Sequence, residues 1–177
     1  IQESGEAEVL NDCYPFDSQT MRQQFFREGR TFNMLITQAA HMPYNYGDSM
    51  SSYALERHPE YYGANGSEEE DCIRAKARLV DDTFARLLDE LEQEGLLENT
   101  VIVALSDHYP YGYTNTEQLL EYSCGTDLLC LDNTPCFIWS ADITPMTVNK
   151  TVNTSDLFPT LLNLLGIEGK YQYLGRD

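Results

Sequence analysis

The stretch that decides the fold reads NTVIVALSDH, residues 99–108. Its centre, from Val101 to Leu105, begins with β-branched residues and is apolar on both faces. A helix followed by such a strand is typical of a parallel sheet that helices cover, so the sequence predicts an α/β fold. The helix is indicated by apolar residues that recur at spacings of three and four: Ile73, Ala77, Val80, Phe84, Leu87, Leu88 and Leu91.

This helix has a recognisable start and stop. Ser67 and Glu70 have the spacing of a capping box, in which side chains satisfy free backbone N–H groups at a helix start. Gly95 stands where a left-handed residue commonly ends a helix. We therefore expect one helix to run from about Ser67 to Gly95 and to lead into the strand at Val101.

Two more apolar stretches predict strands. Residues 31–37, TFNMLIT, are short, apolar and flanked by polar residues, as buried strands are. Residues 135–139, PCFIW, have the same character. We expect the strands near Thr31, Val101 and Pro135 to form a largely parallel sheet with helices on both faces.

Helices are also expected near the two ends of the chain. One begins at Asp17 or Ser18 and stops at Gly29, and the other begins with Ser155 as its cap and stops at Gly166. The last helix should bury a leucine stripe: Leu157, Leu161, Leu162, Leu164 and Leu165.

Two long segments show little periodicity. Residues 38–67 are rich in Tyr, Gly, Asn and Ser, and a loop of this length is usually functional or mobile. Residues 109–133 form a second variable region, within which residues 116–122 predict a short helix.

Composition places the chain among acidic globular domains. Its 177 residues hold 29 Asp and Glu against 11 Lys and Arg, which gives a formal net charge of −18, and 42% are hydrophobic. This charge excludes a nucleic-acid-binding module, whose surface must be basic. No apolar run reaches the roughly 18 residues that a membrane-spanning helix needs. We expect a single domain over residues 1–177, with residues 1–16 as a mobile N-terminal segment.

The five cysteines contain no CxxC pair, which argues against a zinc ribbon or a thioredoxin-type motif. Cys124 and Cys130 are close enough in sequence to bridge a short loop in an oxidising compartment. Scattered reduced cysteines are an equally good interpretation, and the odd number leaves at least one thiol outside any bridge within the chain.

Asp107 and His108 follow directly on the central strand. Ligands of open α/β sheets bind beyond the carboxyl ends of the strands, and a chain that turns there can aim both side chains at one divalent cation. The alternative is that this polar pair only begins a solvated turn.

His41 stands four residues after Thr37, at the end of the first predicted strand. If the two strands are parallel in one sheet, His41 and His108 lie on the same edge. The alternative is a loop residue packed beside Met42 and Pro43. The third histidine, His58, is interpreted as a surface residue.

Four motifs in order resemble a known superfamily. NTVIVALSDH (residues 99–108) resembles the "ENT-(I/V)-(I/V)-…-(G/S)DH" element of the alkaline phosphatase–sulfatase superfamily, and DLFPTLLNLLGI (156–167) resembles its "D-x-x-PTLLxLLG" helix. ITQAAHMPY (36–44) resembles the "T-x-S-x-H-x-P-(Y/F)" element of its lipoteichoic acid synthase branch, and YLGRD (173–177) is similar to that branch's "Y-x-x-GRD".

The resemblance implies an alkaline-phosphatase-like fold and a metal-dependent phosphoglycerol transferase. In such enzymes a threonine attacks the phosphate of phosphatidylglycerol, diacylglycerol leaves, and the glycerophosphate passes to an acceptor hydroxyl. It implies that Asp107 and His108 bind a divalent metal, with Mn²⁺ the first choice, and that His41 is the catalytic, substrate-contacting histidine. It also implies a parent protein anchored by upstream membrane helices, with its catalytic domain at the extracellular face.

The sequence departs from that pattern upstream. The family's nucleophilic Thr and metal-binding Glu precede the "TxSxH" element, and residues 1–30 show no equivalent of either. The chain is therefore expected to be an incomplete half of the catalytic domain, inactive without the upstream half that is its partner.

Two other functions stay open. One is a sulfatase or phosphoesterase hydrolase of the same superfamily, which would differ in its upstream nucleophile. The other is a non-catalytic acidic interaction domain that has kept the fold.

Overall fold

The computed structural model describes residues 12–123, 131, 133–168 and 172–175. The chain divides into two compact units, Ile1–Ile143 and Thr144–Asp177, and each is described here by itself. Residues 1–11 of the predicted mobile segment, and the cysteines Cys124 and Cys130, lie outside the described residues. The prediction of a single domain over residues 1–177 stays a prediction.

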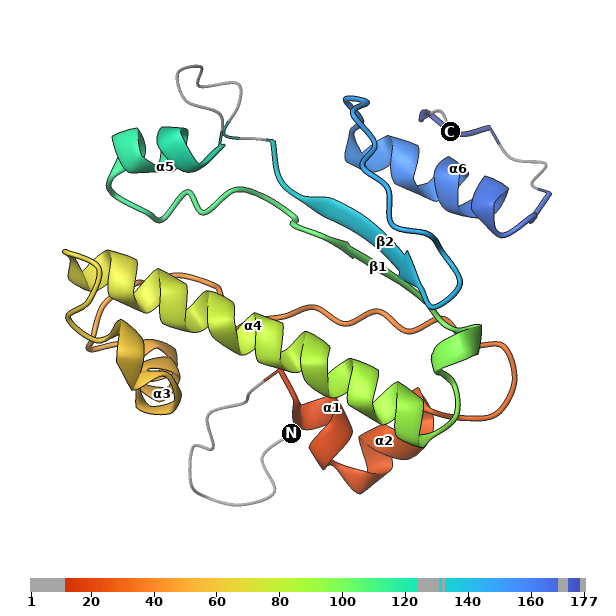
Figure 1. Ribbon diagram of the computed structural model, residues 1–177, viewed down its shortest axis with the longest axis horizontal. Helices are drawn as coiled ribbons and strands as arrows, with labels where there is room; N and C mark the ends of the chain where they lie inside the picture. The colour runs from red at the N-terminus through yellow and green to blue at the C-terminus, as the bar shows by residue number, and fades with distance from the viewer. Residues whose placement is uncertain (1–11, 124–130, 132, 169–171, 176–177) are drawn as a thin grey trace. The chain divides into compact units, whose positions relative to one another are not determined.

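The long helix α4, Glu68–Gln93, runs along the first unit (Figure 1). Its caps are the predicted ones: the Ser67 hydroxyl accepts the N–H of Glu70 at 3.1 Å, and Gly95 has a left-handed φ of 68°. The predicted apolar stripe is mostly half-buried. The residues of α4 that are fully buried are largely polar: Glu70, Asp71, Cys72, Ala75, Lys76, Leu79, Thr83, Glu90 and Leu91.

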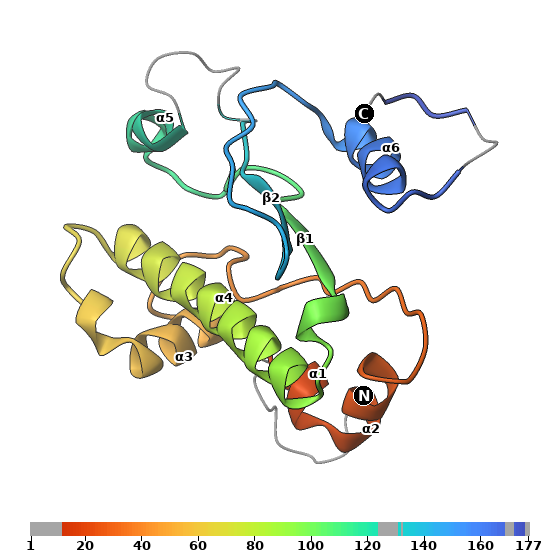
Figure 2. The same ribbon diagram turned by 45° about the vertical axis from the view of Figure 1, so that its right-hand side comes forward.

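The segment 38–67 is not a plain loop. It contains helix α3, Ser49–Arg57, and a short 3₁₀ turn, Pro59–Tyr61. Helix α3 begins at Asp48, whose carboxylate accepts the N–H of Ser51 at 2.8 Å, and it packs along α4 (Figure 2). Weak apolar periodicity hid this helix, because its cap and its packing on α4 stabilise it more than an apolar stripe does.

Asp71 of α4 organises the turn that leads into the helix. Its carboxylate accepts the N–H of Gly63 at 2.6 Å, the N–H of Asn65 at 2.9 Å and the hydroxyl of Tyr46 at 2.6 Å. The bond to Asp71 raises the pKa of Tyr46 to about 12, with partial burial a lesser cause. A buried carboxylate therefore orders much of the Tyr-rich segment.

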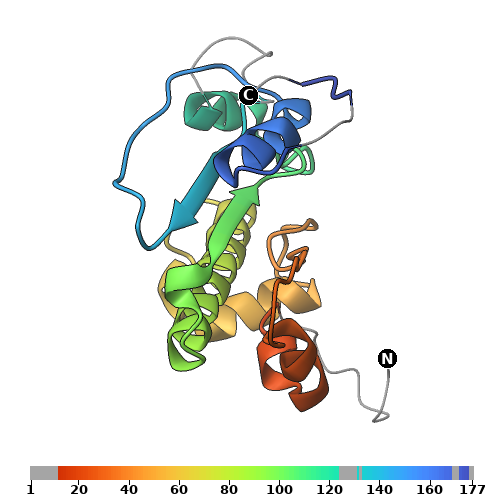
Figure 3. The same ribbon diagram turned by 90° about the vertical axis from the view of Figure 1, so that its right-hand side faces the viewer.

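The described sheet has two strands, β1 at Val101–Leu105 and β2 at Cys136–Ser140. They pair antiparallel, with Val101 opposite Ser140 and Leu105 opposite Cys136 (Figure 3). The predicted parallel arrangement is wrong for this pair. Apolar pattern identifies a strand but carries no information on its direction, which the connection through residues 106–135 decides.

The predicted strand at residues 31–37 is also wrong. This segment has no strand partner among the described residues, and its alternate side chains Phe32, Met34 and Ile36 are exposed. An extended apolar segment becomes a buried strand only when neighbours pair with its backbone and cover its faces.

Shorter helices complete the first unit. These are α1 (Tyr14–Asp17), α2 (Gln19–Phe25), the 3₁₀ turn at Leu97–Asn99, and α5 (Thr116–Ser123), which the sequence predicted over residues 116–122.

Two aromatic contacts tie these elements together. Ser18 caps α2 as expected, and the rings of Phe16 and Phe25 lie 5.5 Å apart. Phe84 of α4 meets Phe137 of β2, with ring centroids 5.6 Å apart, so α4 contacts one face of the sheet. Helical cover on the second face stays a prediction.

The second unit contains helix α6, Thr154–Leu164. Its cap is Asn153 rather than the predicted Ser155: Asn153 and Asp156 form a complete capping box. None of its residues is fully buried: Leu157, Leu161 and Leu162 are half-buried and Leu164 is exposed, so the predicted burial of the leucine stripe is wrong for this structure. Gly175 lies against the first turn of α6, where an added Cβ would be 2.0 Å from the carbonyl oxygen of Ser155.

No described helix combines the length and apolarity that crossing a bilayer requires.

Candidate functional site

His41 lies in a turn that begins at the end of the exposed 31–37 segment. The turn is fixed by Asp12, whose carboxylate accepts the N–H of Gln38 at 2.7 Å and that of buried Ala39 at 3.0 Å. The imidazole itself is exposed, with Nδ1 2.8 Å from the carbonyl oxygen of Met42. A carbonyl only accepts, so Nδ1 carries a proton, and Nε2 has no hydrogen-bond partner among the described residues.

Asp107 and His108 lie directly after β1. The Ser106 hydroxyl donates to the carbonyl oxygen of His108 at 2.6 Å and so closes a tight turn. His108 repeats the arrangement of His41: Nδ1 is 2.7 Å from the carbonyl oxygen of Tyr109, which leaves the Nε2 lone pair free. That Nε2 faces the Asp107 carboxylate at 3.6 Å.

The Asp107–His108 pair fits two ligands of one cation. Two donors that each lie about 2.1 Å from a metal, at the tetrahedral angle, are about 3.4 Å apart. The observed 3.6 Å matches this spacing. A histidine ligand also commonly donates its other ring N–H to a backbone carbonyl, as His108 does to Tyr109. Within the described ranges no group of three or more His, Cys, Asp or Glu gathers, so the pair alone has the spacing of two ligands and not of a complete set.

Lys76 of α4 holds the turn that carries His41. Its buried ammonium donates to the carbonyl oxygens of His41 and Pro43, each at 2.8 Å, and pairs with the Asp48 carboxylate at 2.8 Å. An ammonium has three N–H donors, and all three are used. Partial burial raises the pKa of Asp48, but the contacts with Lys76 and Ser51 outweigh it and lower the pKa below its usual value.

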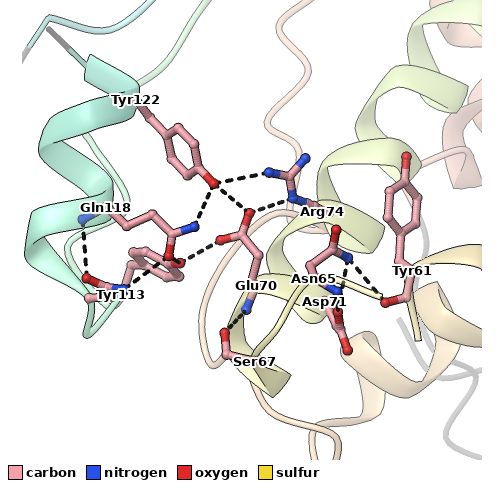
Figure 4. Close-up of polar contacts among 10 residues, drawn as sticks. Tyr61, Asn65, Ser67, Glu70, Asp71, Arg74, Tyr113, Gln118 and Tyr122 are labelled. Atoms are coloured by element: carbon pink, nitrogen blue, oxygen red, sulfur yellow. Dashed lines mark hydrogen bonds and ion pairs between the residues drawn. The ribbon is translucent and has the colours of Figure 1, made fainter. Parts of the chain in front are cut away.

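Glu70 of α4 holds the loop that follows Asp107–His108 (Figure 4). Its carboxylate accepts the hydroxyl of buried Tyr113 at 2.5 Å, the hydroxyl of Tyr122 at 2.9 Å and the guanidinium N–H of Arg74 at 2.5 Å. Gln118 of α5 bridges the two tyrosines, 2.7 Å from each hydroxyl.

The pKa values of this cluster follow from burial and hydrogen bonding. Burial acts to raise the pKa of Glu70, but the bonds from Tyr113, Tyr122 and Arg74 outweigh it, and the net pKa is lowered. Burial first, and then the bond to Glu70, raise the pKa of Tyr113. Glu70 therefore stays an anion and Tyr113 stays a neutral donor.

Helix α4 thus holds both the loop that carries His41 and the loop that follows Asp107–His108. The sequence did not predict the two residues that hold them, Lys76 and Glu70. The sequence predicted Glu70 only as part of the helix cap and gave Lys76 no role. A signal was present: Lys76 lies four residues after Cys72 and three before Leu79, on the face that packs inward.

The chain is similar to known proteins at the level of a family. Residues 20–167 match the family described as Sulfatase. The chain is 24% identical over 152 residues to lipoteichoic acid synthase 2 of Bacillus subtilis, a match that covers 82% of this chain and 22% of that protein. It is 26% identical over 170 residues to the lipoteichoic acid synthase of Staphylococcus saprophyticus, covering 88% and 25%.

A third relative is the ulvan-active sulfatase of Formosa agariphila, 30% identical over 132 residues, with 71% of this chain and 25% of that protein covered. The chain spans about a quarter or less of the length of these curated relatives. No solved structure matches the chain.

Proposed function

From its membership of the sulfatase family, we propose that the chain supplies part of a metal-dependent phosphoglycerol transferase site. Within that family it is a lipoteichoic-acid-synthase-like member of the alkaline phosphatase–sulfatase superfamily. In the proposed reaction, a threonine upstream of this chain attacks the phosphorus of phosphatidylglycerol. The bond from phosphorus to the diacylglycerol oxygen breaks, and the glycerophosphate then passes from threonine to an acceptor hydroxyl.

Asp107 and His108 would hold the divalent cation, Mn²⁺ in the proposal. A bound cation would supply the positive charge that lowers the pKa of a nucleophilic hydroxyl and offsets charge on the phosphoryl oxygens. The chain's own contribution is to keep the carboxylate and the His108 Nε2 lone pair on one side of the turn, as the bonds from Ser106 and to Tyr109 favour.

His41 would contact the substrate. Its Nε2 is free, and the protonated ring would donate from Nε2 to a phosphate oxygen or to the leaving diacylglycerol oxygen. Since Nδ1 is already bound to the carbonyl of Met42, the ring orientation is set before substrate binds.

The observation that carries the proposal is the Asp107–His108 pair, at ligand spacing directly after β1, in a chain that matches the Sulfatase family over residues 20–167. Further proposals follow from the same premise. The parent protein is membrane-anchored and acts at the extracellular face, phosphatidylglycerol is its lipid partner, and the isolated 177-residue chain is inactive without the upstream half.

The test uses the natural full-length protein, labelled phosphatidylglycerol and a Mn²⁺ titration. We expect Asp107→Asn and His108→Gln to reduce transfer by about 100-fold or more and to weaken Mn²⁺ binding measured by calorimetry. Asp89→Asn, an exposed change on α4, is the matched control and should have no effect. If both site variants keep full transfer and full Mn²⁺ affinity, the transferase proposal is wrong and the non-catalytic acidic domain is favoured.

A second candidate is a hydrolase, which the 30% identity to the ulvan-active sulfatase favours. The same protein would then transfer the group to water, and release inorganic sulfate from a sulfate ester or free glycerophosphate from the lipid. Sulfate release with no glycerophosphate transfer would assign the chain to this candidate.

A further inference from the structure

The loop that carries His41 and the loop that follows Asp107–His108 meet where Met42 packs on Gly112. A Cβ placed on Gly112 would lie 2.2 Å from Sδ of Met42, 2.9 Å from its Cβ and 3.2 Å from its Cγ. Gly112 is outside the left-handed region, so its lack of a side chain serves this close approach and not backbone strain. Met42 directly follows His41, and Gly112 lies four residues after His108.

Both sides of this contact are held to α4. Lys76 donates to the carbonyls on either side of Met42, namely those of His41 and Pro43. On the other side, Tyr113 is buried and bound to Glu70, and the backbone N–H and hydroxyl of Thr114 are bound to Glu69 at 2.8 and 2.7 Å.

These anchors lie close together on one rigid element. Glu69 and Lys76 are separated by seven residues, about 10 Å along a helix. Both loops are therefore anchored to one helix, which leaves the Met42–Gly112 contact to set how closely they approach each other within those bonds.

Gly112 is also connected to His108, through the ring of Tyr111. Tyr111 is adjacent to Gly112, and its ring lies 4.6 Å from the ring of His108, centroid to centroid. A displacement of the backbone at Gly112 would reach the His108 imidazole through this contact.

We propose that the Met42–Gly112 contact is a spacer that sets the separation of His41 from the Asp107–His108 pair, which makes Met42 and Gly112 positioning residues. The inference rests on the proposed function in one respect: the groups that it spaces are those assigned to substrate and metal.

The experiment adds and then removes bulk at the contact. Gly112→Ala puts a methyl group into the side chain of Met42. Met42→Ala in the same chain removes the Sδ and Cγ that it meets and leaves only the Cβ of residue 42, at 2.9 Å. Gly47→Ala is the matched control, because its added Cβ would meet a single flexible atom, Oδ1 of Asn45, at 3.3 Å.

The first readout does not depend on any reaction. In NMR spectra of the 177-residue chain, Gly112→Ala should shift the ring resonances of both His41 and His108, and added Mn²⁺ should broaden His41 to a different extent than in the parent chain. The double variant should return both toward the parent values, and Gly47→Ala should leave both unchanged.

The second readout is transfer by the full-length protein. Gly112→Ala should lower kcat by about 10- to 100-fold with a smaller change in KM, and the double variant should recover at least half of that loss on a logarithmic scale. If Gly112→Ala does not fold, Met42→Ala alone carries the test, and it should lower kcat severalfold and shift both histidines.

Each outcome is decisive. Histidine resonances and kcat in Gly112→Ala, or in Met42→Ala, that equal those of the Gly47→Ala control would overturn the spacer. A double variant no better than Gly112→Ala would do the same. Restored histidine resonances in a protein that shows no transfer would support the spacer and count against the transferase.

Discussion

The first half of α4 buries charged side chains, whereas the segment 31–37 exposes apolar ones. Lys76 and Glu70 are charged, and only 1% and 2% of their surface is exposed, whereas Phe32 and Met34 are apolar and 87% and 76% exposed. Each buried charge has partners for its polar atoms, and the apolar segment has no strand beside it in the part of the chain that the structure describes. The difference teaches that a complete set of partners, more than hydropathy, decides what this chain buries.

The largest effect should come from Lys76→Met. The substitution removes three hydrogen bonds and leaves the partly buried Asp48 carboxylate without its cation. We expect the free energy of unfolding of the chain, measured in urea, to fall by about 3–5 kcal/mol.

Arg78→Met is the control for that measurement, since it removes an exposed cation from the same helix. It should change stability by about 0.5 kcal/mol or less. Equal losses in the two variants would mean that the buried ammonium is no more important than a surface one.

Glu70→Gln should have the next largest effect. It replaces a carboxylate that accepts from Tyr113, Tyr122 and Arg74 with a neutral amide. We expect a loss of about 2 kcal/mol in urea unfolding, because bonds to charged groups exceed neutral ones. A loss as small as that of an exposed substitution would mean that the Glu70 hydrogen bonds drawn in Figure 4 contribute little to stability.

Glu70 should also make the free energy of unfolding depend on pH in the acid range. The pKa of Glu70 in the folded chain is below its usual value of 4.5, so between these two values the unfolded chain binds more protons than the folded one. The stabilisation is therefore complete above about pH 4.5 and is lost as the pH falls through the folded pKa. The slope of unfolding free energy against pH in this range should be smaller in Glu70→Gln, and an unchanged slope would assign the acid sensitivity to other carboxylates.

A smaller effect is expected at α6, where no residue is buried and the local cap remains. Asn153→Ala removes one half of the capping box and should cost the helix about 1 kcal/mol. Amide hydrogen exchange in residues 154–158 measures this loss. Asn149→Ala, outside the helix, is the control, and similar exchange in both variants would show that the cap does not stabilise α6.

The smallest effect is expected in the exposed apolar segment. Replacing Phe32, Met34 and Ile36 together by Ser should change the unfolding free energy of the chain by about 0.5 kcal/mol or less, because these side chains are already in water. Leu79→Ala, in the core beneath α3, should cost about 2–5 kcal/mol in the same assay. A triple variant that loses as much as Leu79→Ala would show that the segment is buried in solution.

Elements with strong local signals were predicted well from the sequence. The caps of α4 at Ser67 and Gly95 were correct, and the strand at Val101 and the short helix near Thr116 were placed within a residue or two. Helix α3 was missed, because its start depends on Asp48 and its stability on α4 rather than on an apolar repeat.

For the candidate site, sequence motifs supplied His41, Asp107 and His108 but not their arrangement. The orientations of both imidazole rings depend on backbone carbonyls that a sequence does not position. The residues that hold the loops, Lys76 and Glu70, resemble ordinary surface charges in the sequence.

From the sequence alone came the family, the limits of α4 and the candidate site residues, because caps, periodicities and motifs act over a few neighbouring positions. Only the tertiary structure decided the antiparallel pairing of β1 with β2 and the burial of Lys76 and Glu70. The reason is distance along the chain: Lys76 meets His41 across 35 residues and Glu70 meets Tyr113 across 43, and no local pattern encodes such partners.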